Sequence, residues 1–174
     1  MAGQRGRQFS GRVVQVDVED VTLPNGHVST YEFVRHPGGA AVVALDEQRR
    51  VCLLRQWRPA VGEWVWELPA GKRDHGEDPA LTARRELAEE AGRLASRWTD
   101  LGSNLPSPGV FCEVLYLYLA EDLSETPAAL EPGEVLEVHW VPLAEACRQA
   151  LDGTLRDAKT IIGLLRAAAM RPET

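Results

Sequence analysis

The segment from 79 to 92 constrains this chain more than any other stretch, because it places acidic and apolar residues on one helix. It contains Glu86, Glu89 and Glu90. At about 100° per residue, these side chains share one arc of the helix, about 100° wide. An apolar stripe lies beside that arc and consists of Ala80, Ala83, Leu87, Ala91 and Leu94. We therefore expect converging carboxylates at the rim of a hydrophobic core, facing a groove.

Neighbouring carboxylates repel one another unless they share a cation. Mg²⁺ suits this role because it takes oxygen ligands and keeps several waters that a phosphate can replace. The alternative is an acidic, solvated helix face, which is the usual role of a charge run. The helix has local signals at both ends, because Asp78 suits the N-cap, Pro79 suits the first turn and Gly92 suits the stop.

Positions in and before this helix match the pattern of a known family. They read G-x5-E-x7-R-E-x2-E-E-x-G and are Gly71, Glu77, Arg85, Glu86, Glu89, Glu90 and Gly92. This pattern resembles the Nudix box, the signature of hydrolases that split a diphosphate linked to another group. The family usually has an apolar residue after the last glycine, whereas this chain has Arg93. We expect Leu94 to take over that packing position.

The resemblance implies a metal site and a scaffold that supports it. The metal ligands would be the backbone carbonyl of Ala70 and the carboxylates of Glu86, Glu89 and Glu90. They would hold roughly two or three Mg²⁺ ions, with Mn²⁺ as a substitute, and Glu90 would also be essential for catalysis. Structural roles fall to Gly71, Gly92 and the pair of Glu77 and Arg85, which would hold the loop on the helix.

Length and patterning predict one catalytic domain with an extension. With 174 residues and 44% hydrophobic content, the chain can bury one sizeable core. Apolar runs and alternation predict strands at 11–18, 30–36, 40–45, 51–57, 64–68, 114–120 and 135–141. Helical periodicity predicts helices at 143–151 and 158–169, the last capped by Asp157. This mixture indicates an α/β or α+β sandwich, and the resemblance implies the Nudix α/β/α sandwich with a mixed sheet. We expect a β extension at 1–38, used in dimerisation and substrate contact, and a catalytic domain at 39–174.

Charge and cysteine usage argue against several classes of protein. The net charge of −7 disfavours bulk nucleic-acid binding, which needs a basic surface. The chain has no apolar run of about 18 residues, and no apolar segment follows its basic N-terminus as in a secretory signal. Cys52, Cys112 and Cys147 are odd in number and far apart, as in a cytoplasmic protein with free thiols. We therefore expect a cytoplasmic protein that binds neither nucleic acid nor membranes.

The segments that flank the box resemble one subfamily. Residues 55–59 (RQWRP), 66–71 (WELPAG) and 107–113 (SPGVFCE) are similar to segments of ADP-ribose pyrophosphatases and related nucleotide-sugar hydrolases. The resemblance implies substrate contacts by Arg58, Arg55, Glu67, Gly109, Phe111, Tyr31 and Phe33. Arg58 would grip the diphosphate, because a guanidinium binds phosphate oxygens in bidentate fashion. Alternatively, it is a surface arginine held against Glu67 or Glu63. Tyr31 and Phe33 would stack on adenine, in their own site or a partner's, unless they only pack within their strand.

Hydrolysis also needs a base for the attacking water. The resemblance places this base on a mobile loop before the last strand, here residues 130–135 (LEPGEV). Glu134 fits best by its distance from that strand, Glu131 is the fallback and Glu113 is a third candidate. Proline and glycine beside Glu134 suit a loop that closes over substrate.

The expected reaction is the Mg²⁺-dependent hydrolysis of ADP-ribose to AMP and ribose 5-phosphate. GDP-mannose, another nucleotide sugar and a dinucleotide such as diadenosine polyphosphate are alternative substrates. A more distant alternative is a nucleotide sensor that keeps the fold without the chemistry, although a binding module has no evident need for three mutually repelling glutamates. Because an extra N-terminal sheet must bury its apolar face, we expect a homodimer with exchanged N-terminal strands.

Overall fold

A strand that is buried on both faces lies at the centre of the molecule. The computed structural model describes residues 5–170. Strand β4 (Gly39–Ala44) consists of small and β-branched residues, and every one of them is buried. Val43 packs into one hydrophobic cluster and Val42 into another on the opposite face of the strand. This two-sided burial explains why the segment reads as a continuous apolar run, without polar alternation.

Two sheets build the body around this strand. The four-stranded sheet has the order β7-β4-β9-β8, in which β4 and β9 are parallel and the other pairs antiparallel. Its remaining strands are β7 (Ala70–Lys72), β8 (Arg93–Asn104) and β9 (Leu115–Glu125). The second sheet has the order β10-β5-β6 and comprises β5 (Arg50–Arg58), β6 (Glu63–Glu67) and β10 (Leu136–Pro142). The mixed α/β class expected from the sequence is confirmed.

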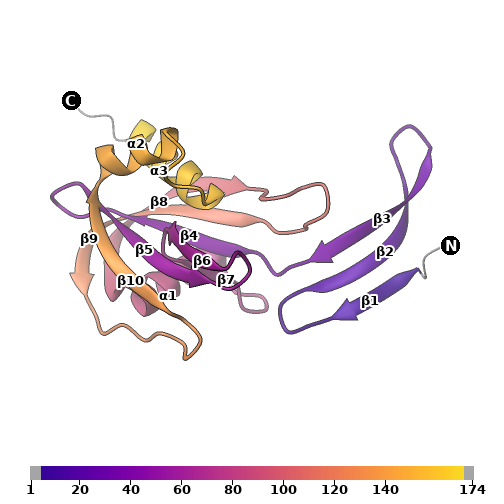
Figure 1. The fold of residues 1–174 in the computed structure, drawn as a ribbon, viewed down its shortest axis with the longest axis horizontal. Helices are drawn as coiled ribbons and strands as arrows, with labels where there is room; N and C mark the ends of the chain where they lie inside the picture. Colours follow the sequence, from indigo (N-terminus) through magenta and orange to yellow (C-terminus); the bar gives the residue numbers. More distant parts are fainter. Residues whose placement is uncertain (1–4, 171–174) are drawn as a thin grey trace.

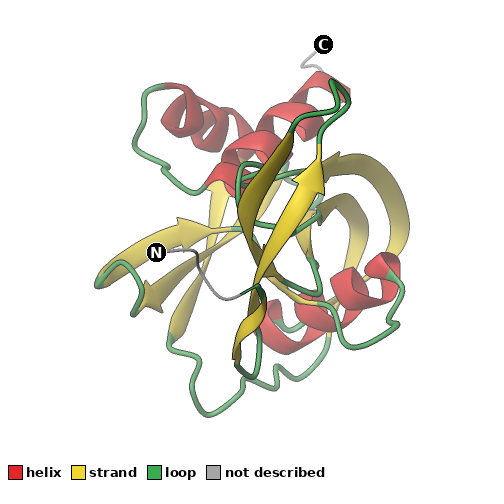
Figure 2. Ribbon diagram, turned by 90° about the vertical axis from the view of Figure 1, so that its right-hand side faces the viewer, coloured by secondary structure: helices red, strands yellow, loops and turns green. Residues whose placement is uncertain are grey.

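Helices cover the body on two sides (Figures 1 and 2). Helix α1 (Pro79–Ala91) packs Ala83 and Leu87 into the cluster that contains Val42. Helices α2 (Leu143–Leu151) and α3 (Ala158–Met170) contribute to the cluster that contains Val43. The molecule is thus layered as helix, sheets and helix, and α1 lies beside the short strand β7.

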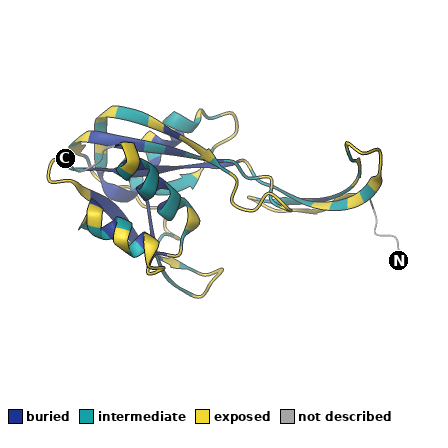
Figure 3. Cartoon of the chain, turned by 90° about the horizontal axis from the view of Figure 1, so that it is seen from above, coloured by how far each residue is buried: buried dark blue, intermediate teal, exposed yellow. Residues whose placement is uncertain are grey.

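A separate antiparallel sheet projects from this body (Figures 1 and 3). Its order is β1-β2-β3, with β1 (Gly6–Ser10), β2 (Gln15–Thr22) and β3 (Val28–Arg35). A bridge between Val34 and Phe111 joins it to the body. Apolar side chains on the sheet stay accessible, and Phe9 is 55% exposed. Such a thin sheet has little core of its own, so its apolar residues are available for a partner.

Several expectations need correction. The strand expected at 11–18 begins only at Gln15 and runs to Thr22. The short strand β7 was not expected, because three residues are too few to show a period. Strands β1 and β8 were not expected, because β8 alternates irregularly between exposed and half-buried positions and β1 is exposed throughout. Leu94 does not continue the stripe of α1, since Gly92 ends the helix in the left-handed conformation and residue 94 lies in β8, 48% exposed. The position after the glycine is filled by Arg93, which pairs with Glu125 and lies over the Trp140 ring.

Candidate active site

Helix α1 begins and ends at the residues that the sequence indicates. The Asp78 carboxylate accepts a hydrogen bond from the backbone N–H of Ala80 at 2.8 Å, and Pro79 occupies the first turn. Gly92 closes the helix at φ 61°, and a Cβ there would lie 2.9 Å from the carbonyl oxygen of Thr126. A side chain at position 92 would therefore be strained by both the backbone conformation and the contact.

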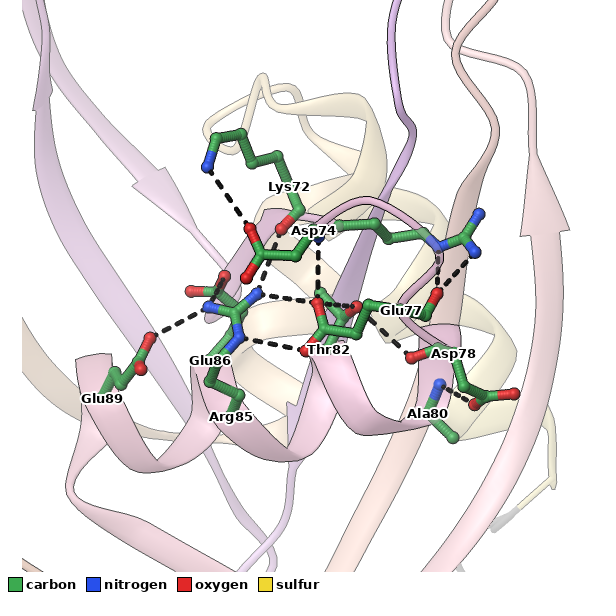
Figure 4. Close-up of polar contacts among 10 residues, drawn as sticks. Lys72, Asp74, Glu77, Asp78, Ala80, Thr82, Arg85, Glu86 and Glu89 are labelled. Atoms are coloured by element: carbon green, nitrogen blue, oxygen red, sulfur yellow. Dashed lines mark hydrogen bonds and ion pairs between the residues drawn. The ribbon is translucent and has the colours of Figure 1, made fainter. Parts of the chain in front are cut away.

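Arg85 links the loop before the helix to the carboxylates along it (Figure 4). Its Nε and Nη2 lie 3.2 and 3.1 Å from the two carboxylate oxygens of Glu77, and Nη2 also donates to the Lys72 carbonyl. Nη1 donates to Glu86 at 2.7 Å and to Glu89 at 3.0 Å. The hydrogen bonds from Arg85 lower the pKa of Glu77 to about 2. This arginine is therefore placed to hold the loop and to offset charge on two of the box glutamates.

Glu90 lies deepest among the box glutamates. Its side chain is buried, and its Oε2 accepts the backbone N–H of Ala70 at 2.7 Å. Burial raises the pKa of Glu90 to about 8, and burial also raises the pKa of Glu86. A carboxylate in such a place is charged at neutral pH only when a cation compensates the cost of desolvation.

Gly71 lies close to the carboxylate of Glu86. A Cβ at position 71 would lie 2.0 Å from Glu86 Oε1, well inside contact distance. Glycine at this position therefore lets the loop of Ala70 and Gly71 pass against the Glu86 carboxylate without displacing that side chain.

The donor set suits a hard divalent cation. Glu86, Glu89 and Glu90 offer carboxylate oxygens from α1, and Ala70 lies against Glu90 through its backbone. The three carboxylates do not form a closed cluster, and among residues 5–170 no group of three acidic, histidine or cysteine side chains does. Instead, the Arg85 guanidinium joins Glu86 to Glu89 while Glu90 faces Ala70. The raised pKa values and the close fit of Gly71 are the observations that favour a cation here.

A second cluster of charged side chains lies near the box and consists of Arg58 on β5, Glu67 on β6 and Lys159 on α3. The carboxylate of Glu67 is 3% exposed and accepts two hydrogen bonds from Arg58, at 2.6 and 2.8 Å. The ammonium of Lys159 pairs with the same carboxylate, and also with Asp157 at 3.0 Å. Burial raises the pKa of Glu67, but the hydrogen bonds from Arg58 and the charge of Lys159 outweigh it and the pKa is lowered. Arg58 is thus held against Glu67, as one of the two interpretations of the sequence expects.

Arg58 nevertheless stays accessible to a substrate. It lines a cavity of about 290 Å³ that opens between the loop of Ala70 and the first turn of α3. Lys72, Glu113 and Lys159 also line this cavity, which we call the substrate cavity. Three cationic side chains thus lie beside the box, where a diphosphate would have to bind.

The base candidates lie in different places. The charge of Glu134 contributes to the raised pKa of both Glu86 and Glu90, so this residue lies near the box. Its carboxylate also accepts the backbone N–H of Glu131 at 2.8 Å, within the loop before β10. Glu113 lines the substrate cavity, 3.2 Å from His36 Nδ1.

The other proposed substrate contacts are not assembled around the cavity within one chain. Arg55 pairs with Glu137 and lies over the Trp64 ring. Phe111 packs beside His36, at 5.2 Å between ring centroids. The rings of Tyr31 and Phe33 stack at 6.2 Å on the projecting sheet. Gly109, in the loop before β9, has open space around it.

Sequence reasoning missed Lys159 and His36, which both line the substrate cavity. Asp157 was expected to cap α3, and it does so by accepting the backbone N–H of Thr160 at 3.0 Å. That cap places Lys159 in the first turn of the helix. No local pattern indicates that this turn faces Glu67, which lies 92 residues earlier in the chain.

Comparison with known proteins identifies the family. The model of the NUDIX domain family matches residues 35–163. This chain is a Nudix hydrolase. It is 40% identical over 154 residues to an ADP-ribose pyrophosphatase of Bacillus subtilis, covering 87% of this chain and 83% of that protein. It is also 40% identical over 158 residues to a methanol dehydrogenase activator of Bacillus methanolicus, covering 90% and 85%.

More distant relatives agree with this assignment. A GDP-mannose pyrophosphatase of Cronobacter sakazakii is 31% identical over 158 residues, covering 82% of this Nudix hydrolase and 81% of that protein. The crystal structure of an ADP compounds hydrolase has the same fold, with a TM-score of 0.80, 21% identity and full coverage of both chains. Nudix hydrolases generally use divalent cations. Between residues 5 and 170, none of the helices is long and apolar enough to cross a membrane.

Proposed function

We propose that this Nudix hydrolase uses Mg²⁺ to hydrolyse ADP-ribose to AMP and ribose 5-phosphate. One observation carries the proposal: the substrate cavity joins the loop of Ala70 to the cations Arg58 and Lys159. A diphosphate in this cavity would lie against the loop of Ala70, whose backbone contacts Glu90, on one side and against the guanidinium of Arg58 on the other. The ADP-ribose pyrophosphatase of Bacillus subtilis, at 40% identity, supports this choice of substrate.

The side chains divide the work of the reaction. Glu86, Glu89, Glu90 and the carbonyl of Ala70 would hold the cations, which neutralise phosphate charge and lower the pKa of bound water. Arg58 would orient the diphosphate by hydrogen bonds to its oxygens. Glu134 would accept a proton from the attacking water, whose oxygen bonds to one phosphorus. The P–O bond to the bridging oxygen then breaks, releasing AMP and ribose 5-phosphate, with Glu131 and Glu113 as competing candidates for the base.

We also propose a homodimer with two regions in each chain, an extension at 1–38 and a catalytic domain at 39–174. The extension of one subunit would contact the catalytic domain of the other. The projecting sheet offers Tyr31 and Phe33 for stacking on a base, and these rings lie away from the substrate cavity of their own chain. A second subunit would bring them to the neighbouring site and cover the apolar residues of the sheet.

A substrate panel tests the proposal. The purified protein is incubated with Mg²⁺ and ADP-ribose, GDP-mannose or diadenosine diphosphate, and the products are separated by chromatography. We expect the highest kcat/KM for ADP-ribose, with AMP and ribose 5-phosphate in equal amounts. Replacing Glu134 with Gln should lower kcat by about 100-fold with little change in the Mg²⁺ requirement. A larger loss for Glu131→Gln or Glu113→Gln would move the base to that residue.

GDP-mannose is the second candidate, because GDP-mannose pyrophosphatases are also related to the chain. A higher kcat/KM for GDP-mannose than for ADP-ribose would identify GDP-mannose as the preferred substrate. Tight nucleotide binding without hydrolysis of any panel member, in Mg²⁺ or Mn²⁺, would instead indicate a sensor.

A further inference from the structure

A second cleft, which we call the basic cleft, lies between the projecting sheet and the loop after β7. It has a volume of about 490 Å³. Its lining includes four cationic side chains, those of Arg12, Arg35, Lys72 and Arg73, against one carboxylate, that of Asp74. The whole chain carries a net charge of −7. The basic cleft is therefore locally positive in a protein whose net charge is negative.

The charge of the basic cleft is only partly compensated. Arg35 pairs with Asp17 at 3.1 Å and with Glu19 at 2.6 Å. Lys72 lies 4.0 Å from the exposed carboxylate of Asp74.

Among residues 5–170, the remaining two guanidinium groups have no carboxylate partner. Arg73 donates from Nε and Nη2 to the backbone carbonyl of Glu77 and lies over the Tyr116 ring, 5.8 Å from its centroid. Arg12 forms no ion pair with any described residue, and its side chain is exposed. Arg12 is consequently the cation most available to an anion, with Arg73 fixed beside it, and guanidinium groups bind phosphate oxygens well.

The basic cleft adjoins the substrate cavity. His36 and Lys72 line both of them. A substrate that places its diphosphate in the substrate cavity would therefore have its neighbouring groups close to the basic cleft, on the side of the projecting sheet. Neutral sugar hydroxyls or a base do not need cations there, whereas a phosphate group would gain from them.

We propose that the basic cleft binds a phosphate group in addition to the hydrolysed diphosphate, such as a phosphomonoester on the ribose of the nucleoside. This inference rests on the proposed function, because it adds one group to the same substrate. Arg12 and Arg73 bind that phosphate, and Lys72 contributes charge from the wall shared with the substrate cavity. The preferred substrate is then a nucleoside diphosphate sugar that carries a further phosphate.

The test compares two substrates that differ by one phosphate, ADP-ribose and ADP-ribose 2′-phosphate. We expect the wild-type enzyme to show about tenfold higher kcat/KM for the phosphorylated substrate, mainly through KM. Arg12→Gln should remove most of this preference and leave kcat/KM for ADP-ribose unchanged, while Arg12→Lys should keep part of it. Arg73→Gln should act in the same direction. Arg156→Gln removes an exposed arginine that pairs with Glu63 outside the basic cleft, so the preference should persist.

A binding measurement separates a substrate phosphate from a free one. Inorganic phosphate is titrated calorimetrically into the metal-free wild type and Arg12→Gln, so that the result does not depend on turnover. Binding that is lost in the variant, without any substrate preference, would support the basic cleft as a site for free phosphate. Equal kcat/KM for both substrates together with no binding that depends on Arg12 would overturn the inference. If the wild type hydrolyses neither substrate, the proposed function fails, and the titration still decides what the basic cleft binds.

Discussion

At the scale of single residues, burial sets the charge state of the site. Glu90 is buried beside the backbone of Ala70, and its pKa is raised to about 8. Glu77, nearer to solvent and bound by Arg85, has its pKa lowered to about 2. Two glutamates of one motif therefore have different roles. Glu77 is charged at every physiological pH and serves the scaffold, while Glu90 would become charged on binding a cation.

This difference predicts an unusual pH dependence of stability. In the metal-free protein, folded Glu90 keeps its proton up to about pH 8, whereas the unfolded chain loses it near the ordinary glutamate pKa of 4.5. Between these values the folded state binds more protons, so the free energy of unfolding should fall as pH rises, by about 3–4 kcal/mol from pH 5 to pH 8. Glu77 does not interfere, since its own contribution is complete above 4.5. Urea unfolding in chelator from pH 5 to 8 measures the slope.

The variant Glu90→Gln provides the control. Its amide oxygen can still accept the N–H of Ala70, but it does not titrate, so the decline with pH should become shallower. Turnover should fall by about 100-fold or more because a metal ligand is lost. An unchanged pH profile in the variant would show that Glu90 does not cause the decline.

Lys159 acts on Arg58 through Glu67. Because the ammonium of Lys159 shares the buried carboxylate, Arg58 keeps net positive charge toward the substrate cavity. Lys159→Met should therefore raise KM for ADP-ribose about tenfold and change kcat less than about threefold. Lys159→Arg should restore most of the affinity. Steady-state kinetics that show a loss in kcat with normal KM would argue for a direct role in the chemistry.

At the scale of elements, α3 is tied to the loop that passes the box. Thr160, fully buried in the first turn of α3, accepts the backbone N–H of Leu68 at 2.8 Å and donates to Asp157 at 2.6 Å. Leu68 directly precedes the segment that enters β7. The helix on one side of the sheets thus fixes the start of the loop whose far end contacts α1 on the other side.

Thr160→Val tests this connection. Valine has nearly the same shape but leaves the N–H of Leu68 without its acceptor, so the free energy of unfolding should drop by about 1–3 kcal/mol. Guanidinium unfolding measures the change. Thr154→Val, at an exposed position between α2 and α3, should stay within about 0.5 kcal/mol of the wild type. Equal effects of the two substitutions would refute the structural role of the hydroxyl.

At the scale of the whole molecule, the projecting sheet buries far less of its surface than the body does. Strand β4 is fully buried, whereas β1 is exposed along its whole length and Phe9 is 55% exposed. A second subunit would cover this surface and bring the aromatic residues of the sheet near a site. Exposed apolar area on such a thin sheet favours association over a free monomer.

Sedimentation equilibrium tests the dimer. We expect the mass of two chains for the wild type and a shift toward one chain for Phe9→Glu, because a charge replaces buried apolar area in the interface. Leu151→Glu introduces the same charge at a residue 75% exposed at the end of α2, away from the projecting sheet, and should leave the mass unchanged. A wild-type protein that sediments with the mass of one chain would contradict the proposed dimer with exchanged strands.

The sequence by itself determined the local features of this protein. Helix α1 with its caps, the neighbouring placement of the box glutamates and the buried character of β4 all follow from residues close in the chain, because helix and strand periods act over a few positions. The tertiary structure decided the rest. The contact of Lys159 with Glu67 spans 92 residues, and the basic cleft brings Arg12 to the loop of Arg73. Such pairs depend on how sheets and helices stack, and that stacking leaves no periodic trace in the residues that it brings together.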